Sequence, residues 1–232
     1  MMRIHTVFIV VLLIVLFGTY AEATTSTEQT LYQYELFEDG IRITYYDGNE
    51  SIVVVPRELN GYKVIGIGED ALSGNKNMWC VVLPDTIRII EDFAFFESSL
   101  REVVLPPSLE YIGDSAFANT KLTSVYIPES VNHLGSAAFY GCYDLSFVKI
   151  VANISEINDH MFFECMSLKD IYLSETILKI GDNAFCYCDS LRSITNYQQI
   201  ESIYTSSFED CDLLSEDIVK HFSSIIILLD EF

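Results

Sequence analysis

The chain has 232 residues, half of them hydrophobic, and a formal net charge of −21 at pH 7. Because such a surface repels phosphates and anionic lipid headgroups, the composition argues against nucleic acid and membrane surfaces as partners. It leaves basic surfaces and divalent cations as counterparts. The length fits one or two globular domains, and the repeat that begins near residue 66 favours one elongated unit.

Residues 1–23 have the pattern of a secretory signal peptide. Arg3 precedes an apolar run from Val7 to Phe17, and Ala21-Glu22-Ala23 matches a small-x-small cleavage site. The run is shorter than the roughly 20 residues that span a bilayer. We predict a secreted or cell-surface protein with a cleaved signal; the alternative, an uncleaved anchor, would be its only membrane contact. Residues 24–30 are predicted to be a flexible polar tether.

Residues 31–65 are predicted to form an N-terminal β-hairpin cap. Three segments of alternating apolar residues, LYQYELF, IRITYY and SIVVV, are separated by the turn sequences Glu38-Asp39-Gly40 and Asp47-Gly48-Asn49. This pattern predicts two consecutive hairpins, and Asn60-Gly61 predicts a further turn. A cap is needed here because a solenoid must shield the apolar side of its first coil.

Residues 66–214 repeat with a period of 22 or 23 residues. The clearest register is a pair of a small and an aromatic residue, whose first members follow one another in steps of 23, 22, 22, 23, 23 and 23 residues. A fixed period of this length indicates a solenoid, in which each coil buries its apolar side against its neighbours. The first members are Ala71, Ala94, Ala116, Ala138, Met161, Ala184 and Ser207.

A short strand is predicted in each repeat, after the small–aromatic pair. Its first, fourth and sixth residues are mostly apolar, as a strand with one buried side requires. Pro84, Pro106 and Pro128 end the first three strands, because proline cannot donate to a continuing ladder. A second apolar pair, such as Leu109 with Ile112, is predicted to turn the coil. The strand segments are MWCVVLP, LREVVLP, LTSVYIP, LSFVKI, LKDIYL and LRSIT.

The repeat pattern Ile-Gly-x-x-Ala-Phe-x-x-Cys-x-x-Leu-x-x-Val-x-Ile-Pro resembles the BspA-type leucine-rich repeat of secreted and surface proteins. The lead-in from Val55 to Gly68 is also similar to that family's approach to its first repeat. The resemblance covers about residues 31 to 215 and departs at Ser98 and Asn196. It implies a solenoid of about seven coils with a parallel sheet on one face, and adhesion to cells, matrix proteins or other surface molecules.

Residues 215–232 are predicted to form a C-terminal cap. Ser215 followed by Glu216 and Asp217 is a helix-start pattern, and an apolar run follows from Ile225 to Leu229. The run is too short for a membrane helix. A truncated next coil and an interaction tail are the alternatives.

Four cysteines are predicted to form a structural ladder inside the solenoid. Cys142, Cys165, Cys188 and Cys211 are each 23 residues apart, so they occupy the same place in successive coils. A metal site needs ligands that converge on one point, which a ladder does not provide. Disulfides between stacked neighbours are the alternative. Cys80 lies at an outward strand position, as a candidate free thiol.

The sequence predicts a non-catalytic protein without a metal or cofactor. It lacks the nucleophile elbow, the zinc-protease helix motif, the phosphate loop and the dinucleotide fingerprint. His133, His160 and His221 occupy different phases of the repeat, so no two of them need meet. Asn49 and Asn153 match the N-glycosylation pattern, which matters only in a cell that carries out this modification.

The outward residues of the strands are the candidate ligand-binding site, on the expected concave face. Tyr126, Phe147 and Tyr172 fall on three consecutive strands, flanked by Lys149 and Asp170. Aromatic residues offer a large contact area at low entropic cost, so we predict that they bind an extracellular protein or a cell-surface glycan or matrix component. The alternative is lateral packing that only stabilises the sheet. A structural spacer or coat component and a carbohydrate-binding module are the competing functions.

Overall fold

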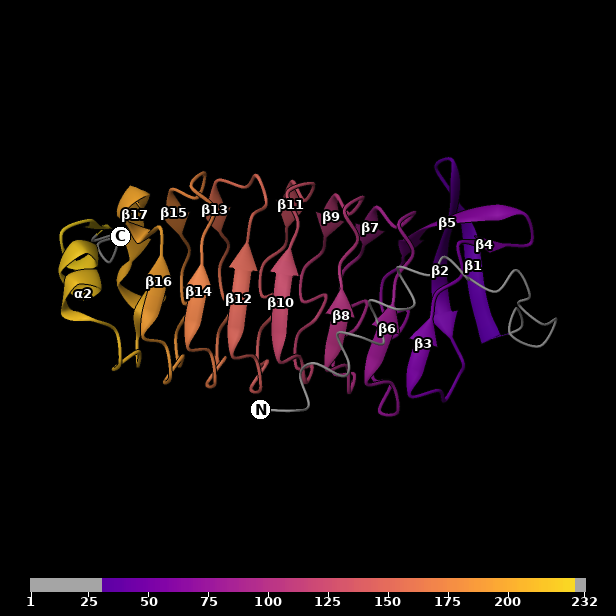
Figure 1. The fold of residues 1–232 in the computed structure, drawn as a ribbon, viewed down its shortest axis with the longest axis horizontal. Coiled ribbons are helices and arrows are strands. Elements are labelled where there is room, and N and C mark those ends of the chain that lie inside the picture. Colours follow the sequence, from indigo (N-terminus) through magenta and orange to yellow (C-terminus); the bar gives the residue numbers. More distant parts are fainter. Residues whose placement is uncertain (1–30, 228–232) are drawn as a thin grey trace, which may run out of the picture.

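Each repeat forms one coil of a parallel β-solenoid in the computed structural model, which describes residues 31–227. The coils stack side by side from the β1–β2 hairpin at one end to helix α2 at the other (Figure 1). The predicted signal peptide and tether lie outside the described residues. Within residues 31–227, no helix has the length and apolar character needed to cross a membrane.

One side of the solenoid carries the longer strand of each coil. These strands pair in parallel in the orders β3-β6-β8 and β10-β12-β14-β16, and the six predicted strands are confirmed. We call the side formed by β8 to β16 the long-strand face. The strands are β6 (Cys80–Val82), β8 (Glu102–Val104), β10 (Ser124–Ile127), β12 (Phe147–Ile150), β14 (Asp170–Tyr172) and β16 (Ser193–Thr195).

A second series of parallel strands runs along the other side of the coils. The sequence predicted only that an apolar pair turns the chain here, because strands this short are too brief to show an alternating pattern. The strands are β7 (Ile89–Ile90), β9 (Tyr111–Ile112), β11 (His133–Leu134), β13 (Glu156–Ile157), β15 (Lys179–Ile180) and β17 (Ser202–Tyr204).

The N-terminal segment contains one of the two predicted hairpins. Strands β1 (Tyr32–Phe37) and β2 (Gly40–Tyr46) pair antiparallel, as expected. The prediction of a second hairpin is wrong, because β3 (Ile52–Val54) does not pair with β2 but pairs in parallel with β6. Strand β2 is also paired in parallel with β5 (Tyr62–Ile67). Because β1 and β5 occupy both edges of β2, β3 cannot pair with it. Residues 40–55 thus contribute one strand to each side, as a coil does.

The turn at Asn60-Gly61 is confirmed. It joins β4 (Glu58–Leu59) to β5 in an antiparallel pair. Gly61 has a φ of 83°, a left-handed conformation that glycine adopts without steric strain.

The C-terminal end is covered by helix α2 (Glu216–Ser223). Its predicted start after Ser215 is confirmed, and acids in its first turn and basic residues in its last turn complement the helix dipole. The short helices η2 (Tyr197–Gln199) and η3 (Thr205–Phe208) precede it. Strand β18 (Ile226–Ile227) then pairs in parallel with β17, and residues 228–232 lie outside the described part of the chain.

A column of stacked phenylalanines fills the solenoid interior. Neighbouring rings from Phe95 to Phe208 lie 5.1–5.6 Å apart and within 18° of parallel. Phe222 of α2 stacks on Phe208 at 4.7 Å and ends the column. Each ring except that of Phe222 is the aromatic member of the repeated pair, so one residue per coil sets the stacking. The column comprises Phe95, Phe117, Phe139, Phe162, Phe185, Phe208 and Phe222.

The Ile-Gly signature reflects a close approach of neighbouring coils. A Cβ atom added at Gly113 would lie 2.5 Å from the backbone nitrogen of Asp92 in the preceding coil. The Asp92 carboxylate in turn accepts a hydrogen bond of 2.8 Å from the backbone N–H of Asp114. Asp114 repeats this contact with Ser136, at 2.7 Å. Several acids of this acidic chain therefore serve to join the coils.

Replacing Phe139 by alanine is expected to destabilise the protein by about 3–5 kcal/mol, because it opens a cavity in the column. Phe147→Ala, which removes the same side chain from the exposed strand face, is expected to change stability by less than about 0.5 kcal/mol. Denaturant unfolding of both variants measures the difference. Equal losses would show that the column does not dominate the packing.

Gly113→Ala is expected to lower stability by about 1–3 kcal/mol, because the new methyl group overlaps the Asp92 backbone. Ala137→Gly provides a control of opposite sign: Ala137 has a φ of 54°, where glycine relieves strain of about 1 kcal/mol or more. Thermal unfolding should therefore give a lower midpoint for the first variant and an unchanged or higher midpoint for the second. A stable Gly113→Ala protein would contradict the close approach.

Candidate recognition surface on the long-strand face

The parallel register arranges the five predicted site residues in two rows across the strands. Phe147 lies between Ser124 and Asp170 in one row. Lys149 lies between Tyr126 and Tyr172 in the other. The three aromatic residues therefore do not form one continuous stripe, because a cation separates the two tyrosines.

Lys149 contacts both of its aromatic neighbours. Its Nζ atom lies 5.8 Å from the ring centroid of Tyr126 and 5.0 Å from that of Tyr172. These are cation–π distances, and each such contact is worth about 0.5–1 kcal/mol at an exposed site. Tyr126 and Phe147 nevertheless remain 52% and 43% exposed. The face thus combines lateral packing with exposed aromatic surface.

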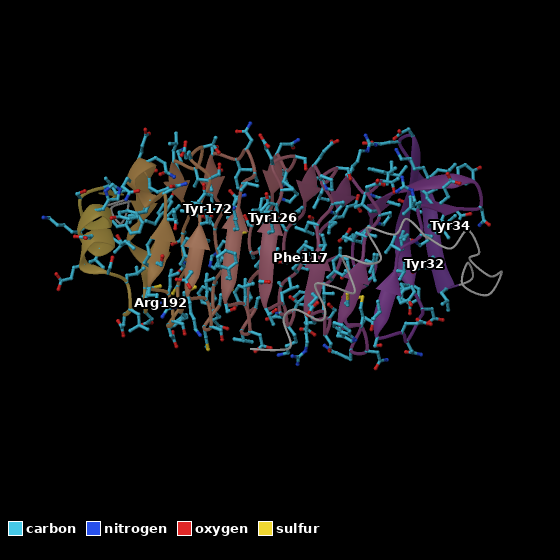
Figure 2. All side chains as sticks on the ribbon, in the orientation of Figure 1. Tyr32, Tyr34, Phe117, Tyr126, Tyr172 and Arg192 are labelled. Atoms are coloured by element: carbon cyan, nitrogen blue, oxygen red, sulfur yellow. The ribbon has the colours of Figure 1, made fainter. Side chains whose placement is uncertain are left out.

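Asp170 is paired with a residue that the sequence analysis did not select. Its carboxylate lies 3.6 Å from the guanidinium of Arg192 on the next coil. Figure 2 shows Arg192, Tyr126 and Tyr172 over the same series of strands. The signal was present in the sequence, because the second residue of three strand segments is basic: Arg101, Lys169 and Arg192.

The outward positions change character towards the N-terminal end. Cys80 is a free thiol, but it is only 3% exposed. Its burial, and to a smaller extent the negative charge of Glu102, raise the pKa of the thiol to about 11. Val82 is buried as well, whereas Val104 is exposed. The pKa of Glu102 is raised by burial. The open part of the face therefore begins at β8.

The four-cysteine ladder lies inside the solenoid. Each thiol donates a hydrogen bond to the backbone carbonyl of the column phenylalanine in the preceding coil. The Cys165 Sγ atom, for example, lies 3.2 Å from the carbonyl oxygen of Phe139. Thr120 occupies the same register one coil before Cys142, and the two side chains lie 3.3 Å apart. All six cysteines of residues 31–227 are free, so the disulfides considered as an alternative are not present in this part of the chain. The remaining thiol donors are Cys142, Cys188 and Cys211.

Sequence reasoning missed a second aromatic group, in which Tyr143 and Tyr187 are exposed and Tyr140 and Phe163 are half-buried. Tyr140 stacks on Phe163 at 5.0 Å, and Phe163 contacts Tyr187 edge-on at 5.4 Å. Tyr143 donates a hydrogen bond of 2.9 Å to Glu164. These residues lie in the turns between the column and the long strands. The signal is a recurring aromatic residue directly after the column phenylalanine, as at Tyr140 and Phe163.

The histidines have separate packing contacts. His133 stacks on Tyr111 at 4.3 Å, and His160 and His221 contact Phe163 and Tyr197. Among residues 31–227, no three His, Cys, Asp or Glu side chains are grouped so that they could hold a metal ion. Asn49 and Asn153 are both exposed, and their glycosylation remains a prediction.

The family comparison agrees with this geometry. The family described as BspA type Leucine rich repeat region matches in six copies, over residues 65–188 and 110–226. The chain belongs to this family. The resemblance inferred from the repeat pattern is therefore confirmed, together with the solenoid fold.

Solved structures of similar proteins are bacterial leucine-rich repeat proteins. A leucine-rich repeat protein from T. pallidum is 27% identical, with a TM-score of 0.59, over 73% of this chain and 91% of that one. A leucine-rich repeat protein from Eubacterium ventriosum is 16% identical, with a TM-score of 0.52, over 82% of this chain and 46% of that one. The second likeness shows the fold alone. No curated protein sequence matches this chain significantly.

Stability is expected to fall in alkaline solution as the buried thiols ionise. Burial raises the pKa of Cys142 from 9.0 to about 11, so above pH 9 the unfolded chain loses a proton that the folded protein keeps. This contribution is complete below pH 9 and is lost as the pH rises towards about 11. Thermal unfolding across this range measures the loss.

Cys142→Thr is the matched variant, because threonine already occupies this register at Thr120. It removes one titrating group and retains a hydrogen-bond donor. Its stability should fall less steeply than that of the parent between pH 9 and about 11. Identical pH profiles would contradict a role for the Cys142 thiol.

Proposed function

We propose that this chain is a secreted or cell-surface, non-catalytic binding protein that recognises an extracellular protein or a cell-surface glycan through its long-strand face. The observation that carries the proposal is the exposure of Tyr126 and Phe147 on adjacent strands of a rigid sheet. Their rings lie at the surface, whereas the rings of the column residues Phe117 and Phe139 are fully buried. Exposed aromatic residues of this kind commonly anchor interfaces.

Rigidity supports the same conclusion. Val125 and Val148, the inward neighbours of these residues, are buried, and the strands are paired in an unbroken register. A surface held in this way loses little conformational entropy on binding. Secretion is proposed from the signal-like residues 1–23, and membership of the BspA-type family fits a surface location.

Binding of residues 24–232 to a panel of matrix proteins, glycans and cell surfaces tests the proposal. The test variant carries Tyr126→Ala, Phe147→Ala and Tyr172→Ala, and a control carries Tyr62→Ala, Tyr143→Ala and Tyr204→Ala, which removes three tyrosines from other parts of the surface. Loss of an aromatic anchor costs about 2 kcal/mol or more, so affinity should fall by a factor of about 30 or more in the test variant.

The control variant should bind as the parent does, and both variants should keep the circular dichroism spectrum of the parent. A ligand retained by the test variant would remove the binding site from this face. If no ligand binds the parent, the proposal fails and a structural spacer becomes the better explanation.

A further inference from the structure

The long-strand face carries a local charge opposite to that of the whole chain. The chain has 34 Asp and Glu residues against 13 Lys and Arg. At the second, third and fifth residues of the strand segments that form β8 to β16, however, basic residues outnumber acidic ones by four to two. The basic residues are Arg101, Lys149, Lys169 and Arg192, and the acidic ones are Glu102 and Asp170.

One of the two acids on the face is paired with a cation, whereas most of the cations are unpaired. Asp170 is paired with Arg192 at 3.6 Å, and burial favours the protonated form of Glu102 by raising its pKa. Within residues 31–227, Arg101, Lys149 and Lys169 form no salt bridge. The ammonium group of Lys149 contacts the rings of Tyr126 and Tyr172.

Screening allows this local charge to act despite the net charge. At physiological ionic strength, exposed charges further apart than about 8 Å have little effect on each other. Packed sheets are about 10 Å apart, so Asp92, Asp114 and their equivalents on the other side of the coils contribute little at this face. Asp144 and Asp189 lie closer, in the turns that lead into β12 and β16, and the exposed Glu129 and Glu175 follow β10 and β14. These acids border the face at its two ends and leave the cations on the strands between them.

We propose that the long-strand face binds a linear anionic polysaccharide bearing carboxylate or sulfate groups; this inference rests on the proposed function and specifies its ligand. The exposed rings of Tyr126 and Phe147 suit stacking on sugar rings, which an acidic peptide does not supply. Adjacent strands are about 4.8 Å apart, close to the advance of such a polymer per sugar. A chain crossing β10 to β16 therefore meets an aromatic ring or a cation on each strand.

Binding of residues 24–232 to immobilised heparin, alginate, neutral dextran and polyglutamate tests this inference. The face variant carries Arg101→Glu, Lys169→Glu and Arg192→Glu. The control carries Lys63→Glu, Lys179→Glu and Lys220→Glu, which changes the net charge equally at exposed basic residues elsewhere. We expect heparin or alginate to bind the parent, more than tenfold weaker binding to the face variant, and a change within about twofold for the control.

Three outcomes would overturn the inference: no binding to either anionic polysaccharide, equal weakening in both charge variants, or polyglutamate binding as tight as heparin binding. The last outcome would indicate an acidic protein partner. Failure here leaves the proposed function intact if a protein or neutral glycan from the panel still depends on Tyr126, Phe147 and Tyr172. Failure of both experiments would remove the face as a binding site.

Discussion

Stacking of one phenylalanine per coil on the next is the interaction on which the rest of the structure depends. The rings from Phe95 to Phe222 form a continuous column, and helix α2 closes it. The backbone N–H groups of Phe117 and Phe139 also donate hydrogen bonds to the next coil, at 2.9 and 3.1 Å. Ring stacking and backbone pairing therefore impose the same spacing on every coil.

This spacing separates the residues that hold the fold from those that face the solvent. Inside, the column phenylalanines stack on one another, and the buried thiols donate hydrogen bonds to their carbonyl groups. In the turns, aspartates such as Asp92 and Asp114 accept backbone hydrogen bonds from the next coil. The long strands are then held in register with their outward residues free. Lys149 between Tyr126 and Tyr172 is a direct product of that register.

The sequence predicted the fold well, because the solenoid repeats the same local solution. The pair Ala116-Phe117 and its equivalents located the repeats of residues 66–214, and the long strands followed from their buried positions. The second hairpin was missed because Ile52–Val54 has the alternation of any strand, and its partner β6 is set by tertiary pairing. The separation of Tyr126 from Tyr172 by Lys149 depends on cross-strand register, as does the pairing of Asp170 with Arg192.

Native-state hydrogen exchange of the column amides tests the central claim most directly. If stacking couples the coils into one rigid unit, the backbone N–H groups of Phe95, Phe139 and Phe185 should exchange with similar free energies of opening, close to that of global unfolding. The same values should fall together in Phe139→Ala. Opening energies that decrease coil by coil from Phe139 towards either end would contradict the account, because each coil would then open independently of the column.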